Sequence, residues 1–457
     1  MARQTWSSRL TYVLTVAGAT IGFGATWRFP YLVGQNGGGA YVLTFIIVMA
    51  LVGVPIILVE NVIGRRAHAD SVTAFTGTAC GKAISPLWKG VGYLGLLGAF
   101  GILAYYMVIG GWVLSYIFNI TAGALGFSGL DLSVPVTKEV TEAFYTEHIE
   151  NSPLSIIFYT FVFVIINYLI LRKGIIKGIE RAVKYLMPLL FICLIIMVLR
   201  NLTLEGAGPG VTFYLKPDFS KITPQLFLDV LGQVFFALSL GFGVMITLSS
   251  HLSAKEDMVK TAAITGVINT LIAVLAGFMI FPSLFSAGLA PDSGPSLVFK
   301  TLPIAFSQLS FGSFFAVVFF VLLIVAALTT SVTIYQVMIS VLYERFHIRA
   351  AGSINIALWV VFILGNIPCA LSYGPLKDVT FIGRNIFDAF DYISGNICFV
   401  LTALGCTLFV GWVLKEEALA EISNQHTLKS GIYRLWFNYV RYVVPFIILA
   451  IFIYGLI

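Results

Sequence analysis

Charged residues are scarce in this chain of 457 residues: only 11% are Asp, Glu, Lys or Arg, whereas 59% are hydrophobic. Soluble domains carry about 25% charged residues. This deficit excludes an ordinary soluble domain, and the long apolar runs predict a polytopic membrane protein. The net charge of +6 comes from basic residues between those runs, so it does not indicate nucleic-acid binding.

Cysteine is also scarce. The five cysteines are scattered and form no CxxC pair, which excludes a disulfide framework and argues for apolar filler. At membrane depth we find no nucleophile–base pair and no cluster of metal-ligating residues, so we do not expect an enzyme. No loop is long enough for a catalytic or signalling domain. The first apolar run lacks a small-residue cleavage site, so no signal peptide is expected.

The hydrophobic pattern predicts an all-α fold with eleven transmembrane helices. The runs span residues 10–30, 40–63, 88–120, 153–171, 183–200, 226–250, 258–286, 311–343, 353–371, 386–414 and 437–457. We expect two inverted five-helix repeats over residues 1–200 and 201–414, followed by a cytoplasmic loop and helix 11 over 415–457. Most basic residues face the cytoplasm if the N-terminus does, which puts the C-terminus outside a plasma membrane.

Two of these runs carry glycines where a membrane helix should continue unbroken. The first contains Gly18, Gly22 and Gly24 before Arg28, and the sixth contains Ser239-Leu240-Gly241-Phe242-Gly243. Bare backbone at membrane depth is tolerated where it lines a cavity, so a broken helix predicts a binding site. Packing faces of small residues are the alternative. Two such segments in corresponding halves favour broken helices 1 and 6 of a secondary transporter.

Polar residues in other runs allow two interpretations. Thr329, Thr330 and Ser331 are consecutive hydroxyls at mid-membrane depth; they either bond to the preceding helical turn or, beside an unwound helix, ligate a hard cation. Ionisable residues stand near helix ends, with Arg28 and Asp391 on the outer side and Arg3 and Glu344 on the inner side. Such groups usually snorkel to the interface, but paired across a pathway they would act as gates.

Taken together, several motifs resemble the neurotransmitter:sodium symporter family, in its short bacterial amino acid transporter branch. They are Gly22-Phe23-Gly24, Trp27-Arg28-Phe29-Pro30, Asn36-Gly37-Gly38-Gly39-Ala40-Tyr41, Lys177-Gly178-Ile179-Glu180-Arg181, Gly232-Gln233-Val234-Phe235-Phe236 and the hydroxyls at 329–331. The resemblance covers essentially the whole chain. It implies the inverted-repeat fold and sodium-coupled symport of a small solute by alternating access.

The resemblance also implies a substrate site at the two helix breaks. Tyr106 and the backbone N–H groups of Phe23 and Gly24 would bind the substrate carboxylate, and Ser239 with nearby carbonyls would hold the amine. The implied substrate-binding set is Thr20, Phe23, Gly24, Ile102, Tyr106, Phe236, Ser239, Phe242 and Ile334. Gly22 stands where monoamine transporters of the family have an aspartate, which implies an apolar amino acid or an amino acid-like solute that carries its own carboxylate.

One of the family's two sodium sites is intact in this sequence, by the same resemblance. It would use carbonyls of Gly18, Ile21 and Ala326 with the hydroxyls of Thr329 and Thr330. The second site is degenerate: the Thr20 carbonyl and Asn269 remain, but Ala25 and Ala237 replace two side-chain ligands. The chloride position is also altered, since Phe45, Ala237 and Ala273 replace polar residues. We therefore expect one Na⁺ per cycle and no chloride.

The implied outer gate consists of Arg28 and Asp391 with Gln233 beside them, and the inner gate of Arg3, Trp6 and Glu344. The leading hypothesis is thus a sodium symporter with a lipid bilayer around it, present as a monomer or weak homodimer. Two alternatives stay open. One is a proton-coupled or uncoupled carrier or exporter of a solute other than an α-amino acid. The other is a membrane sensor that does not cycle.

Overall fold

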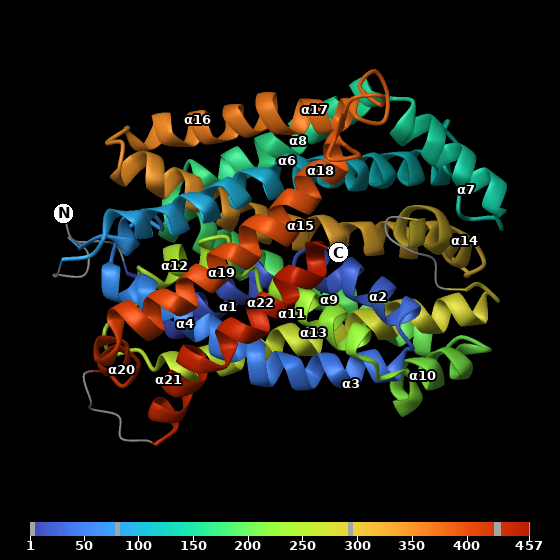
Figure 1. The fold of residues 1–457 in the computed structure, drawn as a ribbon. Coiled ribbons are helices and arrows are strands. Elements are labelled where there is room, and N and C mark those ends of the chain that lie inside the picture. Colours follow the sequence, from blue (N-terminus) through green and yellow to red (C-terminus); the bar gives the residue numbers. More distant parts are fainter. Residues whose placement is uncertain (1–4, 78–82, 291–295, 425–430, 457) are drawn as a thin grey trace.

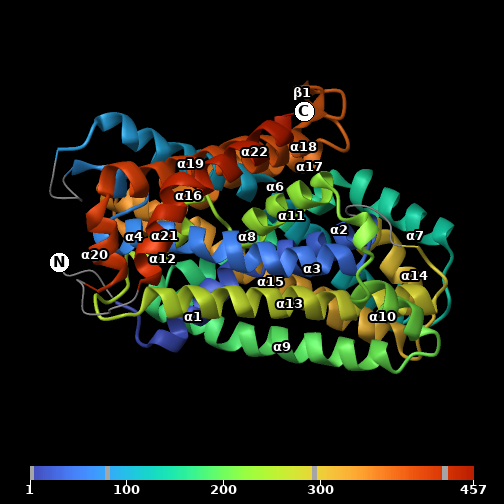
Figure 2. The ribbon, with the colours of Figure 1, turned by 60° about the horizontal axis from the view of Figure 1, so that its bottom comes forward.

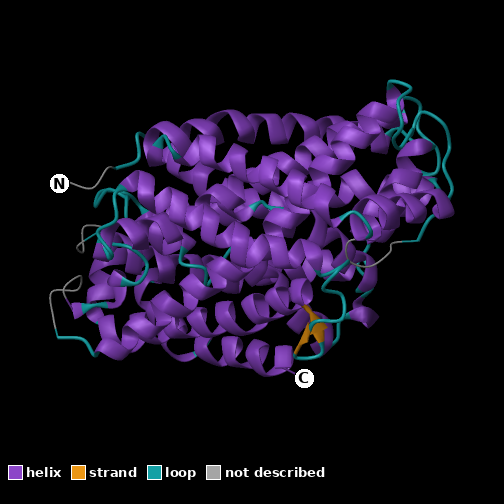
Figure 3. Ribbon diagram, turned by 90° about the horizontal axis from the view of Figure 1, so that it is seen from above, coloured by secondary structure: helices purple, strands orange, loops and turns teal. Residues whose placement is uncertain are grey.

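The computed structural model describes residues 5–77, 83–290, 296–424 and 431–456. These residues form an elongated helical bundle (Figures 1 and 3). A two-stranded antiparallel hairpin, β1 (Thr380–Phe381) with β2 (Arg384–Asn385), is the one sheet in the described ranges. In Figure 1 the N-terminus lies at the left end, and α7, α10 and α14 lie at the right end. The long helices run between these two ends.

The first half of the described chain contains long helices joined by short π- or 3₁₀-helical segments (η). They are α1 (Arg9–Thr20), η1 (Gly24–Arg28), α2 (Phe29–Gln35), α3 (Gly39–Val48), η2 (Met49–Gly53), α4 (Val54–Ala67), η3 (Thr73–Phe75), η4 (Pro86–Trp88), α6 (Lys89–Ala124), α7 (Lys138–Tyr145), η5 (Thr146–Glu150), α8 (Pro153–Leu171), η6 (Ile175–Glu180) and α9 (Arg181–Leu202).

The second half of the described chain follows the same plan. It contains α10 (Ala207–Leu215), η7 (Phe219–Lys221), α11 (Pro224–Ala237), α12 (Val244–Ser249), α13 (Met258–Ser286), η8 (Leu297–Thr301), α14 (Leu302–Ser307), α15 (Gly312–Glu344), α16 (Ala350–Val361), η9 (Phe362–Asn366), α17 (Ile367–Leu371), α18 (Ile386–Tyr392), η10 (Ile393–Cys398), α19 (Phe399–Leu408), η11 (Phe409–Leu414), α20 (Glu416–Ile422), α21 (Ile432–Tyr442) and α22 (Val444–Leu456).

Nine helices in the described ranges are long and apolar enough to cross a membrane. A tenth span is the bent pair formed by α1 with η1 and α2, and the short helices α11 and α12 together cover the sixth predicted run. The all-α polytopic membrane fold is thus confirmed. The count of eleven spans stays a prediction, with which this arrangement is consistent.

Two long helices, α6 and α15, pass through the middle of the bundle and pack against each other (Figures 1 and 2). Small residues on α6 let its neighbours approach closely. A Cβ added at Gly98 would meet the ring of Phe399 at 2.7 Å, and one added at Gly111 would meet the backbone N of Thr160 at 2.9 Å. Because lipid offers no hydrophobic gain for helix association, such close contact holds the bundle together.

The predicted boundaries differ from the structure outside the apolar runs. The first run was expected to end at residue 30, but α2 continues to Gln35, and the last was expected to begin at 437, but α21 begins at Ile432. The short helices α7, α10, α14 and α20 were not predicted. They lie at the ends of the bundle, where mixed composition gives no long apolar signal. The four cysteines in the described ranges are buried and free, as expected of apolar filler.

Candidate substrate and sodium sites

The first helix is broken at mid-length. α1 ends at Thr20, the helix resumes at Gly24, and the two halves differ in direction by 55°. Glycine is required at the break: a Cβ at Gly22 would lie 2.6 Å from the hydroxyl oxygen of Thr330 and would overlap the hydroxyl of Tyr106. The break therefore brings bare backbone directly against α6 and α15.

The second break separates α11 from α12. Ser239, Gly241 and Gly243 have φ values of 51°, 81° and 76°, a left-handed conformation in which a right-handed helix cannot continue. The backbone N–H of Gly241 donates to the Glu60 carboxylate at 2.7 Å, and Glu60 is fully buried. The sequence analysis missed Glu60. A lone carboxylate near the end of the apolar run 40–63 was the available signal.

A small cavity of about 10 Å³ lies between the two breaks. It is lined by Ala19, Thr20, Gly22, Phe23, Gly24, Ile102, Tyr106, Phe236, Ser239, Phe242 and Thr330. Of the residues expected to bind substrate, all except Ile334 are in this lining. Ile334 is buried in α15, but Thr330, one helical turn earlier, supplies the α15 wall. Ala19, Gly22 and Thr330 are additional lining residues.

Hydrogen bonds on the cavity wall join each helix break to a neighbouring helix. The backbone N–H of Phe23 donates to the hydroxyl of Tyr106 at 3.3 Å, and the Ser239 hydroxyl donates to the Ala19 carbonyl at 3.0 Å. The Phe23 and Tyr106 rings lie 4.7 Å apart, and a Cβ at Gly24 would meet the Phe236 ring at 2.9 Å. The wall thus combines N–H and hydroxyl groups with apolar rings.

Oxygen atoms from α1 and α15 converge beside this cavity. Thr330 donates its hydroxyl proton to the Gly18 carbonyl at 3.1 Å, and Thr329 donates to the Ala326 carbonyl at 2.9 Å. Ile21 is the C-cap of α1, where carbonyls lose their helical partners. The donor set of carbonyls and hydroxyls is the one that a hard cation prefers, so these residues fit sodium.

A side-chain amide bridges the residues that were expected to form a degenerate second sodium site. Asn269 donates from Nδ2 to the Thr20 carbonyl at 3.1 Å and to the Ala237 carbonyl at 3.2 Å. Within the described residues its Oδ1 has no hydrogen-bond partner. Ala25 and Ala237 are fully buried and offer only methyl groups, as expected for a site that has lost two side-chain ligands. The polar hydrogens of Asn269 therefore stand between the two breaks, where a cation would need oxygens.

At the outer side, Arg28 and Asp391 line a common cavity of about 220 Å³. The Arg28 guanidinium lies over the Phe236 ring, 4.5 Å from its centroid. The described ranges hold no ion pair between Arg28 and Asp391, so these two side chains, which were expected to form a gate, share the cavity without closing it as an ion pair. Gln233 was expected beside the pair. It is buried and donates to the Gly24 carbonyl at 2.7 Å, which also accepts the backbone N–H of Phe29.

At the opposite end, the Trp6 indole N–H donates to the Leu248 carbonyl at 3.0 Å and joins the segment before α1 to α12. Glu344 lines a cavity of about 670 Å³ with His251, whose ring lies 6.3 Å from that of Trp6. Arg3 lies outside the described residues. Ser7 contacts Glu180 through its hydroxyl and its backbone N–H, a contact that the sequence analysis did not anticipate.

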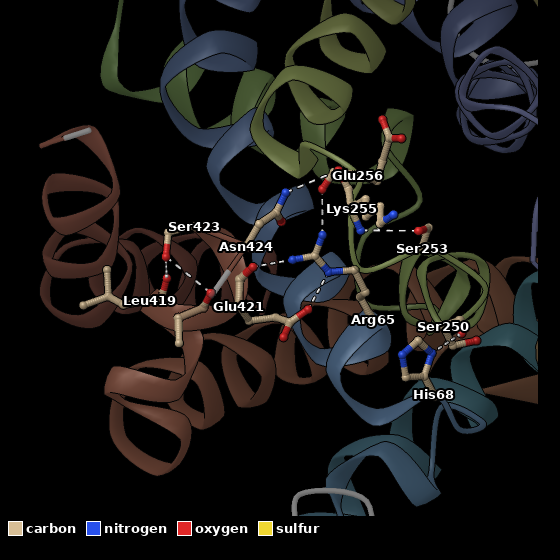
Figure 4. A network of polar contacts seen from close by, with 11 residues as sticks. Arg65, His68, Ser250, Ser253, Lys255, Glu256, Leu419, Glu421, Ser423 and Asn424 are labelled. Atoms are coloured by element: carbon tan, nitrogen blue, oxygen red, sulfur yellow. Dashed lines mark hydrogen bonds and ion pairs between the residues drawn. The ribbon is translucent and has the colours of Figure 1, made fainter. Parts of the chain in front are cut away.

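A buried arginine organises the same end of the bundle (Figure 4). Arg65 pairs with the carboxylate of Glu421 and donates to the Glu256 carbonyl at 2.7 Å. Glu256 in turn pairs with Arg9 at 2.8 Å. These contacts connect α4, the segment before α13, α20 and α1. The sequence offered no local sign of them, because the partners are far apart in the chain.

Comparison with known proteins identifies the family. A profile described as the "Sodium:neurotransmitter symporter family" matches residues 3–155 and 146–457. The chain belongs to this family. It is 63% identical over 456 residues to an "Uncharacterized sodium-dependent transporter" of Haemophilus influenzae, covering 99% of this chain and 98% of that protein. The family resemblance stated from the motifs is thus confirmed, and the relatives named here support a sodium-dependent transporter rather than an enzyme.

Two further comparisons show similarity to transporters of this family whose names give a ligand or substrate. The crystal structure of MhsT in complex with L-phenylalanine superposes with a TM-score of 0.87 at 37% identity, covering 99% of this chain and all of MhsT. The human sodium- and chloride-dependent taurine transporter is 26% identical over 499 residues, covering all of this chain and 78% of its own length. The family fold is therefore shown over nearly the whole chain.

Proposed function

We propose that this family member is a sodium-coupled symporter for a small apolar amino acid or amino acid-like solute. The observation that carries the proposal is the meeting of both helix breaks at the cavity bounded by Phe23, Tyr106 and Ser239. Backbone N–H groups and a phenol hydroxyl suit a carboxylate, and a hydroxyl with freed carbonyls suits an ammonium group. The bound L-phenylalanine of MhsT supports an amino acid.

The size of the cavity indicates that binding requires movement. About 10 Å³ holds roughly one water molecule. A solute therefore needs the rings of Phe236 and Phe242 to part. Both rings lie at the second break: Phe236 is near the end of α11, and Phe242 is in the segment between α11 and α12. Substrate entry and outer-gate opening would then be one motion, since Arg28 rests on Phe236.

A single sodium ion per cycle follows from the two unequal ion sites. Thr329 and Thr330 keep their hydroxyls beside the carbonyls of Gly18 and Ala326. At the other site Ala25 and Ala237 supply no side-chain oxygen, and the Asn269 amide already donates to the available carbonyls, so fewer oxygens remain for a cation there. Phe45 packs 4.6 Å from Phe29, so an aromatic contact takes the place of a chloride ligand. Chloride independence is part of the proposal.

Alternating access would use the charged pair at the outer side and the Trp6 contact at the inner side. We place the N-terminus in the cytoplasm and the C-terminus outside, following the basic residues, in a plasma membrane. The two inverted halves, 1–200 and 201–414, and a monomeric or weakly dimeric state are part of the same proposal. The paired breaks near mid-depth favour cycling over a fixed sensor.

The proposal is tested by binding to purified protein. A panel of L-amino acids and related amines and acids is measured with sodium or with potassium, and with chloride or with gluconate. We expect a sodium-dependent apolar hit, a sodium Hill slope near one, and no effect of gluconate. A slope near two would show that the second ion site survives. Binding without sodium dependence would support the proton-coupled or uncoupled alternative.

A further inference from the structure

An apolar groove of about 220 Å³ runs along the outside of the bundle between α8 and α16. Its lining includes Phe161, Val164, Leu358 and Trp359. Trp359 is 51% exposed. Tyr168 and Asn355 are its polar lining residues. Both stand near the same end, because Tyr168 comes late in α8 and Asn355 comes early in α16. The groove is therefore apolar along its length and polar at one end.

That polar end is followed directly by the inner cavity of about 670 Å³. The chain after α8, including Arg172 and Lys173, lines this cavity, and so do Ala350 and Ile354 at the beginning of α16. We call the groove and this end of the cavity the α8–α16 seam. Figure 1 shows α8 and α16 side by side along one edge of the bundle, and the two helices are in contact.

The seam carries positive charge at its polar end. Arg172 and Lys173 are exposed there and line the cavity. Glu344 is the one carboxylate in that lining, and it belongs to the side formed by α15. The basic pair lies at the end of α8 that our orientation puts at the cytoplasmic surface. Basic residues in this place attract anionic headgroups.

We propose that the α8–α16 seam binds an anionic phospholipid of the cytoplasmic leaflet. One acyl chain would lie in the groove against Trp359 and Val164, and the phosphate would lie between Arg172 and Lys173. A free anion would leave the apolar groove unfilled, and an uncharged lipid would not use the basic pair. This inference depends on the cytoplasmic orientation of that end and not on the identity of the transported solute.

Quenching of tryptophan by brominated lipid tests the proposal on the full chain. The protein is placed in phosphatidylcholine nanodiscs that contain a small fraction of phosphatidylglycerol or phosphatidylcholine brominated on the acyl chain. The signal of Trp359 is the difference between wild type and Trp359→Phe. We expect stronger quenching of Trp359 by the phosphatidylglycerol. Equal quenching by the two lipids would overturn the proposal, and this comparison needs no variant of the basic pair.

A second experiment removes the two basic side chains of the seam and repeats the quenching measurement. A basic side chain near an anionic surface contributes about a factor of five, so Arg172→Gln with Lys173→Gln should lower the phosphatidylglycerol preference roughly 25-fold. The matched control is Lys184→Gln with Arg434→Gln, two exposed basic residues outside the seam lining. The control should retain the preference. A preference that survives loss of the seam pair, or that falls equally in the control, would contradict the phosphate contact.

Discussion

The Asn269 side chain donates a hydrogen bond from Nδ2 to the Thr20 carbonyl at 3.1 Å, across the break of the first helix. A second hydrogen bond from the same nitrogen reaches the Ala237 carbonyl at the other break. One amide thus links the two segments that surround the candidate substrate cavity. A hydrogen-bond donor here satisfies carbonyls that an ion would otherwise satisfy.

Replacing Asn269 should therefore separate stability from ion binding. Asn269→Ala leaves two buried carbonyls without a donor, so we expect a loss of about 2–4 kcal/mol in the free energy of unfolding. The sodium Hill slope should stay near one and the sodium affinity should be unchanged. Chemical denaturation and sodium titration of substrate binding measure the two quantities. A strong loss of sodium affinity in a folded variant would mean that Asn269 ligates an ion.

The opposite pattern is expected at the intact sodium site. Thr329→Ala removes a hydroxyl that would contact the ion, and polar contacts to a charged group contribute about 1.5–3 kcal/mol, so sodium affinity should fall at least tenfold. Ser331→Ala is the matched control, because the Ser331 hydroxyl donates to Asn167 and not to the site. Sodium-driven uptake into proteoliposomes checks both variants. Unchanged uptake in Thr329→Ala would refute the assignment of this ion site.

Removing the charge of Arg28 or Asp391 should lower the rate of transport but not the stability of the fold. Because Arg28 and Asp391 face a cavity without an ion pair between them in the described structure, Arg28→Gln and Asp391→Asn should fold with near wild-type thermal stability. Uptake should fall about tenfold or more, since the pair would form only in the closed state, where a charged pair contributes over 1 kcal/mol. Equilibrium binding beside uptake separates the two effects. Equal loss of both would place Arg28 in binding and not in gating.

The Trp6 indole should hold the inner side closed. Trp6→Phe keeps an aromatic ring but loses the hydrogen bond to Leu248. A neutral hydrogen bond contributes about 1 kcal/mol, so opening of α1 should become roughly fivefold more frequent. Hydrogen–deuterium exchange of residues 9–20 reports this change. Trp88→Phe serves as control, because Trp88 packs on Phe409 away from α1. Identical exchange in Trp6→Phe and wild type would argue against this contact as a latch.

The buried Glu60 should act as a hydrogen-bond acceptor for the second break. Glu60→Gln retains an oxygen for the Gly241 N–H and should cost little, whereas Glu60→Leu leaves that donor unsatisfied and should cost about 1–3 kcal/mol. Thermal unfolding of both variants in the same detergent provides the comparison. Equal destabilisation would indicate that the charge of Glu60 matters more than its acceptor oxygen.

The sequence predicted features of the site where a segment contains residues that are unusual in an apolar membrane helix. Glycines in an apolar helix marked both breaks, and consecutive hydroxyls marked Thr329 and Thr330. Contacts between single polar residues far apart in the chain were not predictable in this way. Glu60 with Gly241 and Ser7 with Glu180 join segments more than 170 residues apart, and no local periodicity relates such partners. The hydrogen bond from Gln233 to the Gly24 carbonyl, 209 residues away in the chain, was unpredictable for the same reason.

The left-handed residues at 239, 241 and 243 have a thermodynamic consequence for the transport cycle. Their backbone angles, with the Glu60 contact, keep the segment between α11 and α12 non-helical. Loading the cavity then requires no helix–coil transition. The two half-helices can rotate about this joint as rigid bodies. The heat-capacity change of the cycle should therefore come from the surface exposed as the rings and the two sides open, with no contribution from unwinding this segment.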